Sequence, residues 1–90
     1  METKMRTEKE IYETFRKRFK EKRIERGLTF EELEKLTGVK KSCIQRYETG
    51  GTGKIPLDAV IKLEYILGVT PGYLCGLDLS WKYLLEEFYA

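Results

Sequence analysis

The sequence predicts an all-α fold, a single domain built as a bundle of five or six helices. Three observations lead to this prediction. Apolar residues recur at the three- and four-residue spacing of an amphipathic helix along most of the chain. Threonine, proline and glycine stand at positions where helices begin or end. No segment shows the alternation of apolar and polar residues that a half-buried strand requires.

The first helix is expected over residues 8–26, after a flexible N-terminus of residues 1–7, and Gly27 ends it. The apolar face of this helix is made of residues that lie four positions apart, namely Ile11, Phe15 and Phe19.

The second helix begins at Thr29, because Thr29 and Glu32 stand at the two positions of a capping box. In such a box the threonine hydroxyl accepts the amide of the glutamate, whose side chain reaches back to the cap. We expect Leu33 and Leu36 to face inward, and Gly38 to supply a tight turn to the next helix.

The third helix is expected over residues 40–49, with Ile44 and Tyr47 on its buried side, and it opens with two lysines. Residues 49–53 contain three glycines and cannot continue the helix, so a flexible loop follows. Pro56 ends that loop. A short helix followed by a basic helix across a tight turn is a compact device for reading duplex DNA.

The fourth helix covers residues 57–67, with Gly68 as its C-cap. It carries a broad apolar stripe made of Leu57, Val60, Ile61, Leu63, Ile66 and Leu67. Thr70 and Pro71 then begin a short fifth helix, because proline is well suited to a first helical position. This fifth helix carries Tyr73 and Leu74.

A sixth helix is expected over residues 79–88, within a C-terminal segment of residues 77–90. Its apolar side is formed by Trp81, Leu84, Leu85 and Phe88, at helical spacing. Two interpretations remain open for this stripe. It folds back onto the first helix, or it contacts a second copy of the chain together with Tyr83 and Tyr89. In the first case its partners would be Ile11, Tyr12 and Phe15.

The charges are distributed unevenly, although the formal net charge is only +2. Residues 1–26 carry ten Lys/Arg against six Glu, and the segment 40–54 carries four Lys/Arg against one Glu. Residues 55–90 carry two lysines against five acidic residues. A basic first half suits a polyanion bound on one face, whereas the alternative is an ordinary solvated mixture of charges.

Several classes of function are not indicated. The chain has no histidine, and Cys43 and Cys75 have no close partner, so we expect no metal site and no cofactor. The chain lacks a phosphate-cradling Gly-Lys-Ser/Thr loop, and we expect neither enzymatic activity nor a small-molecule ligand. No apolar run approaches the roughly 18 residues of a membrane span, and the polar start is no signal peptide. A cytoplasmic protein without membrane contact is expected.

From residue 15 to residue 74 the chain resembles the helix-turn-helix family of phage repressor and Cro proteins, the xenobiotic-response-element type. The resemblance rests on an ordered series of short motifs: Lys22-Arg23-Ile24, Gly27-Leu28-Thr29, Glu32-Leu33, Gly38-Val39, Ser42-Cys43-Ile44, Tyr47-Glu48, Gly50, Pro56 and Leu67-Gly68-Val69. It implies a five-helix, lambda-repressor-like bundle, here with the sixth helix added. Residues 8–76 would then form the DNA-binding domain of a prokaryotic or phage transcriptional regulator.

The resemblance also implies roles for particular residues. Base edges would be contacted from the third helix by Lys40, Lys41, Ser42, Gln45 and Arg46. The DNA backbone would be contacted by Thr29, Phe30, Thr49, Thr52 and Lys54. Arg23 and Glu48 would form an ion pair that ties the first helix to the third. The implied partner is double-stranded DNA, bound by a homodimer on a two-fold site with half-sites about 34 Å apart.

The chemistry of these residue types agrees with the implied roles. Arginine can bridge O6 and N7 of guanine, and glutamine can do the same for N6 and N7 of adenine. Lysines beside phosphates release counterions, which makes binding depend on salt. Positions 41, 42, 45 and 46 share the side of the helix opposite Ile44 and Tyr47.

Three residues depart from the family pattern. Phe30 stands where a glutamine often bonds a phosphate, which leaves packing on a sugar or contact with a protein. Glu34 replaces a small residue at the crossing of the two helices, so it must point outward or widen the crossing. Cys43 replaces serine or threonine, and we interpret it as packing. These departures keep an alternative function open, a protein-interaction module of antitoxin-like or adaptor type.

Overall fold

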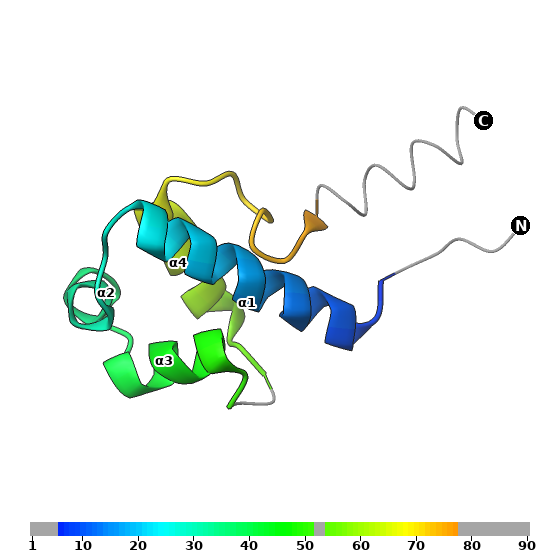
Figure 1. The fold of residues 1–90 in the computed structure, drawn as a ribbon, viewed down its shortest axis with the longest axis horizontal. Coiled ribbons are helices and arrows are strands. Elements are labelled where there is room, and N and C mark those ends of the chain that lie inside the picture. Colours follow the sequence, from blue (N-terminus) through cyan, green and yellow to red (C-terminus); the bar gives the residue numbers. More distant parts are fainter. Residues whose placement is uncertain (1–5, 52–53, 78–90) are drawn as a thin grey trace, which may run out of the picture.

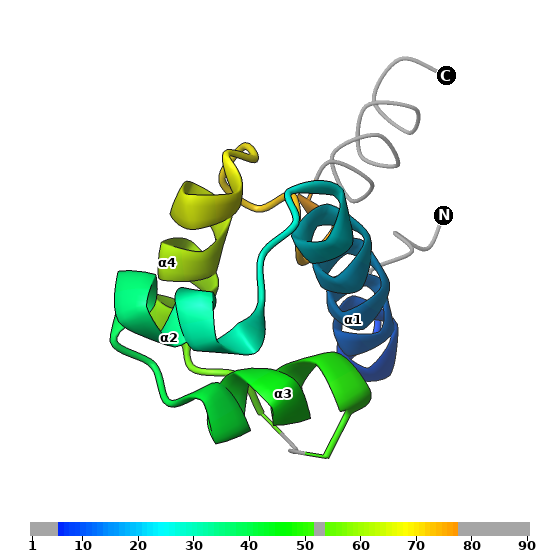
Figure 2. The ribbon, with the colours of Figure 1, turned by 60° about the vertical axis from the view of Figure 1, so that its left-hand side comes forward.

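The computed structural model describes residues 6–51 and 54–77, which form four helices and no strand (Figure 1). The helices are α1 (Glu8–Glu25), α2 (Phe30–Thr37), α3 (Lys41–Thr49) and α4 (Leu57–Leu67). The all-α prediction is confirmed for this part of the chain. Figure 2 shows α1 and α4 on two sides of the bundle, with α2 beside α4 and α3 crossing below.

Local sequence signals set the ends of the helices. Both α1 and α2 begin with a complete capping box, formed by Thr7 with Glu10 and by Thr29 with Glu32. The predicted turn between α2 and α3 is confirmed at Gly38, whose φ of 77° lies in the left-handed region that glycine enters without a steric penalty.

The start of α3 differs by one residue from the prediction. Lys40 has a ψ of 136°, which is outside the helical region, and serves as the N-cap, so the helix begins at Lys41. The predicted fourth helix is confirmed from Leu57 to Leu67, with Gly68 as its C-cap.

The core lies where all four helices meet. Phe15 and Phe19 of α1 stack with ring centroids 5.5 Å apart and are fully buried. The other buried apolar residues of the described chain are Leu33, Ile44, Tyr47, Ala59, Val60, Leu63, Leu67 and Leu74. Aromatic and aliphatic burial of this kind is the main source of the stability of a small domain.

Three residues that were expected to be buried are exposed. Leu36 is 56% exposed, because α2 turns Leu33 and Thr37 toward the core and leaves Leu36 at the edge. On α4, Leu57 and Ile61 are 73% and 56% exposed, since Ala59, Val60, Leu63 and Leu67 form the buried face of this helix. The predicted stripe was therefore too broad.

The predicted fifth helix is replaced by turns over residues 71–76. Gly72 and Gly76 have φ angles of 85° and 75°, and such angles interrupt the repeat of an α-helix. The turns are held by the bundle instead: the buried carboxylate of Glu64 accepts the amide of Leu74 at 3.1 Å, and Arg18 Nη1 donates to the carbonyl of Tyr73 at 2.7 Å. The predicted sixth helix and the predicted flexible N-terminus, except residues 6 and 7, lie outside the described residues.

Candidate nucleic-acid interface

α2 and α3 form a helix-turn-helix unit in which Glu34 joins the two helices. Lys40 provides no side-chain cap for α3. Glu34 Oε1 instead accepts the backbone amide of Lys41, the first residue of α3, at 2.9 Å. A carboxylate at a helix N-terminus also interacts favourably with the helix dipole. The half-buried Glu34 therefore does not simply point outward, but crosses the turn and caps the second helix of the unit.

Replacement of Glu34 by alanine is expected to lower the free energy of unfolding by about 1 kcal/mol, since α3 would lose its only side-chain cap among the described residues. Urea unfolding measures this difference. Lys35→Ala is the matched control, because Lys35 is the exposed neighbour on the same helix. Equal losses from the two variants would contradict the capping role.

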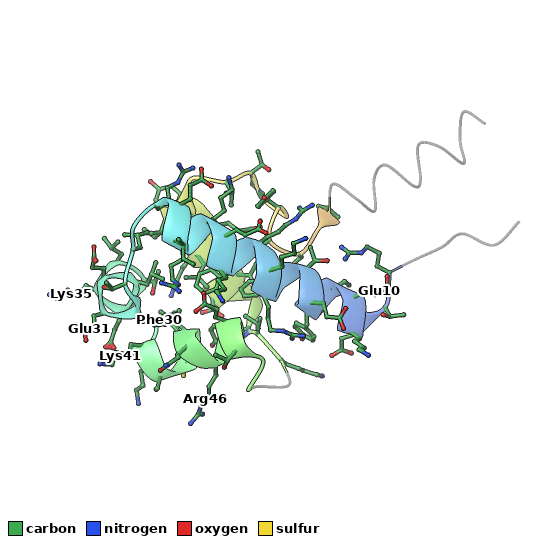
Figure 3. The ribbon with its side chains drawn as sticks, in the orientation of Figure 1. Glu10, Phe30, Glu31, Lys35, Lys41 and Arg46 are labelled. Atoms are coloured by element: carbon green, nitrogen blue, oxygen red, sulfur yellow. The ribbon has the colours of Figure 1, made fainter. Side chains whose placement is uncertain are left out.

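The five residues predicted to contact bases lie together on the exposed side of the unit. They are Lys40, Lys41, Ser42, Gln45 and Arg46, and each is exposed. The opposite side of α3 is fixed in the core by Ile44 and Tyr47, which are 0% and 7% exposed. Figure 3 shows the Arg46 side chain pointing away from the bundle. The described part of the chain leaves this side of α3 uncovered.

Carboxylates of α2 stand close to one end of this surface. Lys41 Nζ lies 3.3 Å from Glu31 Oε1 of α2, ten residues earlier in the chain (Figure 3). The two side chains are 53% and 74% exposed. An ion pair at such exposure contributes roughly 0–1 kcal/mol and is easily exchanged for another partner. Lys41 can therefore leave Glu31 for a phosphate or a base.

The residues predicted to contact the DNA backbone are only partly brought together. Thr29 and Phe30 lie beside α3 and line an open depression of about 370 Å³, together with Glu31, Lys41 and Gln45. The depression lies at the N-terminus of α2, where the helix dipole favours an anion, while the amide of Glu32 is already bonded to Thr29 Oγ1 at 3.1 Å. Thr49 and Lys54 are exposed toward the other end of α3, and Thr52 lies outside the described residues.

An ion pair joins α1 to α3 behind this surface. Arg23 Nε and Nη2 donate to the two carboxylate oxygens of Glu48 at 3.0 and 3.2 Å, a bidentate geometry. Their side chains are 17% and 8% exposed. Arg23 Nη1 also donates to the carbonyl of Leu28 at 3.2 Å. This arrangement fixes the angle of α3 relative to the longest helix of the described chain.

The departure at Phe30 has a structural role in this ion pair. The guanidinium carbon of Arg23 lies 4.4 Å from the centroid of the Phe30 ring, within the range of a cation–π contact. The half-buried ring thereby shields the ion pair from water on the side of α2. The contact needs both Phe30 and Arg23, which lie on different helices. A comparison with the family pattern at one position at a time therefore does not reveal it.

Three further residues contribute to the packing and the charge around α3. Cys43 is a half-buried free thiol that packs against the core, in agreement with the packing interpretation. Arg16 of α1 passes the C-cap of α3, where its Cδ lies 3.2 Å from the position that a Cβ on Gly50 would take. The negative end of the helix dipole at the C-terminus of α3 interacts favourably with the Arg16 guanidinium at this place. Burial raises the pKa of Tyr47, with Cys43 and Asp58 adding to the effect, so its phenol stays neutral beside the interface.

Metal chemistry finds no support in the described part of the chain, where no three His, Cys, Asp or Glu side chains gather to hold an ion. None of the described helices combines the length and the apolar character needed to cross a bilayer.

Comparison with known proteins agrees with this geometry. A family model described as helix-turn-helix matches residues 19–74, which is more than half of the chain. The match begins inside α1 and ends in the turns after α4, so it includes the whole candidate interface. No curated protein and no solved structure matches the chain.

Proposed function

The chain belongs to the helix-turn-helix family of phage-repressor and Cro type, and from this premise we propose that it is a transcriptional regulator that binds double-stranded DNA in a sequence-specific manner. The observation that carries the proposal is the exposed polar side of α3, held rigidly by two buried residues on its other side. A rod of this kind fits the major groove of B-DNA, which is about 12 Å wide.

The surface offers two kinds of contact. Arg46 and Gln45 are suited to bidentate hydrogen bonds with guanine and adenine, which supply sequence preference. Lys40, Lys41 and the N-terminus of α2 are suited to phosphates, which fix the register of the protein on the duplex. The protein acts in the cytoplasm of a prokaryotic or phage-infected cell, as a homodimer on a two-fold site. Its output is repression, by occlusion of a promoter.

Selection of binding sites from a random duplex pool tests the proposal, followed by fluorescence-anisotropy titrations of the selected duplex at several salt concentrations. We expect a selected site with two-fold symmetry and an affinity that falls linearly with the logarithm of salt. Absence of binding to every duplex at low salt would reject the proposal. Binding without sequence preference would reject its base-reading part.

A second function is favoured by one observation, an exposed apolar face on α2 and α4. Leu36, Ile61 and Tyr65 are 56%, 56% and 83% exposed and line a groove of about 360 Å³ with Thr37, Lys62 and Ile66. Apolar surface of this kind is typical of protein contacts. The protein would then be an antitoxin-like or adaptor module that has kept the fold and binds operators weakly.

Charge reversal separates the two functions. In the variant with Lys41→Glu and Arg46→Glu, a DNA-binding regulator loses duplex binding while its circular dichroism is unchanged. A protein-interaction module keeps its partner binding in the same variant, because both substitutions lie outside the groove of α2 and α4.

A further inference from the structure

An apolar groove lies between the first turns of α1, the start of α4 and the turns after α4. It has a volume of about 300 Å³, and residues of α1, of α4 with the segment just before it, and of the turns after α4 line it: Glu8, Ile11, Tyr12, Phe15, Ile55, Leu57, Val60 and Cys75. Leu57, at the groove, is 73% exposed. Burial of such aliphatic surface is favourable by about 25 cal/mol per Å², so the groove favours an apolar occupant.

The groove lies at the end of α1 that the family match does not include. The match begins at Phe19, whereas α1 begins at Glu8. In Figure 1 the first turns of α1 extend past α3 and α4. Ile11 and Tyr12 in these turns are only half-buried, although they continue the apolar face that Phe15 and Phe19 bury in the core. The added part of α1 therefore presents apolar side chains that the described bundle does not fully cover.

The described chain ends beside this groove. Cys75, two residues before the last described residue, lines it. Arg6, just before α1, donates from Nη1 to the carbonyls of Cys75 and Gly76 at 3.2 and 3.4 Å. The amide of Leu77 donates to the carbonyl of Gly72 at 2.9 Å. These bonds fix the position of the last described residues beside the groove.

We propose that the C-terminal segment 79–88 of the same chain occupies this groove as an amphipathic helix, with Trp81, Leu84, Leu85 and Phe88 facing Ile11, Tyr12 and Leu57. The four apolar residues of the segment have the i, i+3, i+4, i+7 spacing of one helix face. The ten residues 79–88 would form a helix of about 15 Å, long enough to cover the two exposed turns of α1.

The tether favours this intramolecular arrangement over exchange with a second copy. Leu77 is two residues from a residue of the groove, so the segment has a high local concentration there, on the order of millimolar for a short linker. A second copy at micromolar concentration competes poorly with such a tether. The two flanks outside the family match thus form one added layer, which extends the bundle without covering α3.

Trp81 provides a direct test in the full-length chain, because it is the sole tryptophan. We expect blue-shifted emission and low quenching by acrylamide, at every concentration at which sedimentation shows a monomer. The groove variant Leu57→Gln and the tail variant Leu84→Gln with Leu85→Gln should both shift the emission toward that of the urea-unfolded chain. Ile61→Gln is the matched control, since Ile61 is also an exposed aliphatic residue of α4 but lies outside the groove.

Thiol alkylation supplies a second readout. Mass spectrometry of the peptides compares Cys75, which lines the groove, with Cys43 on α3 as the internal reference. Both variants should accelerate alkylation of Cys75 and leave that of Cys43 unchanged. The tail variant keeps the test valid if Leu57→Gln impairs folding. A wild-type emission maximum equal to that of the urea-unfolded chain would overturn the proposal. Protection of Trp81 from acrylamide only at concentrations at which a dimer forms would overturn it as well.

Discussion

Replacement of Arg23 by alanine is expected to lower the free energy of unfolding by about 3–5 kcal/mol. The substitution leaves the Glu48 carboxylate, which is only 8% exposed, without the cation that balances its charge. It also removes the hydrogen bond to the carbonyl of Leu28 and the contact with the Phe30 ring. Because small domains are stable by only about 5–15 kcal/mol, the loss would be a large part of the total.

Urea and thermal unfolding of the purified variants measure this effect. Lys20→Ala is the matched control, since Lys20 is an exposed cation on the same helix. We expect its stability to remain within about 0.5 kcal/mol of the wild type. An unchanged melting curve for Arg23→Ala would contradict the claim that the ion pair with Glu48 stabilises the packing of α3 on α1.

Replacement of Arg46 by alanine is expected to weaken binding to the selected duplex by about 1–3 kcal/mol, or about 5- to 150-fold in Kd. The exposed guanidinium points away from the bundle, where it can reach the edge of a guanine (Figure 3). The preference at one base pair should relax at the same time. Anisotropy titrations with the selected site and with single-base variants of it measure both effects.

The control for this prediction removes an equal charge elsewhere. Lys62→Ala changes an exposed cation of α4 that pairs with Asp58 and lies outside α3. Its duplex affinity should stay close to that of the wild type. If both variants weaken binding equally and without a change in base preference, Arg46 would contribute only to a general electrostatic attraction.

Helix ends and the tight turn were predictable because their causes are local. The capping box at Thr29 needs only Glu32, three residues later, and the left-handed turn at Gly38 needs only the glycine itself. The burial of Ile44 and Tyr47 followed from spacing along one helix. The same spacing fixes which residues of α3 are exposed, whereas their assignment to base contacts came from the resemblance to the family and stays a prediction.

The remaining features depend on contacts between residues far apart in the sequence. Periodicity alone placed Leu36 inside, but the position of α4 relative to α2 leaves it at the edge of a groove. The capping of Lys41 by Glu34 crosses the turn, and the contact of Phe30 with Arg23 joins two helices. Glu34 and Phe30, which depart from the family pattern, thus stabilise the helix-turn-helix unit. Their presence is therefore a weaker reason to doubt DNA binding.

The most direct test of the central claim is an NMR titration of the labelled protein with the selected duplex. We predict that the largest amide shifts fall on Lys40–Thr49 and on the first turn of α2, with small changes on α4. Two results would contradict the claim that α3 reads DNA. One is a titration in which the amide shifts are confined to the groove of Leu36, Ile61 and Tyr65, and the other is a titration without any amide shift in α3.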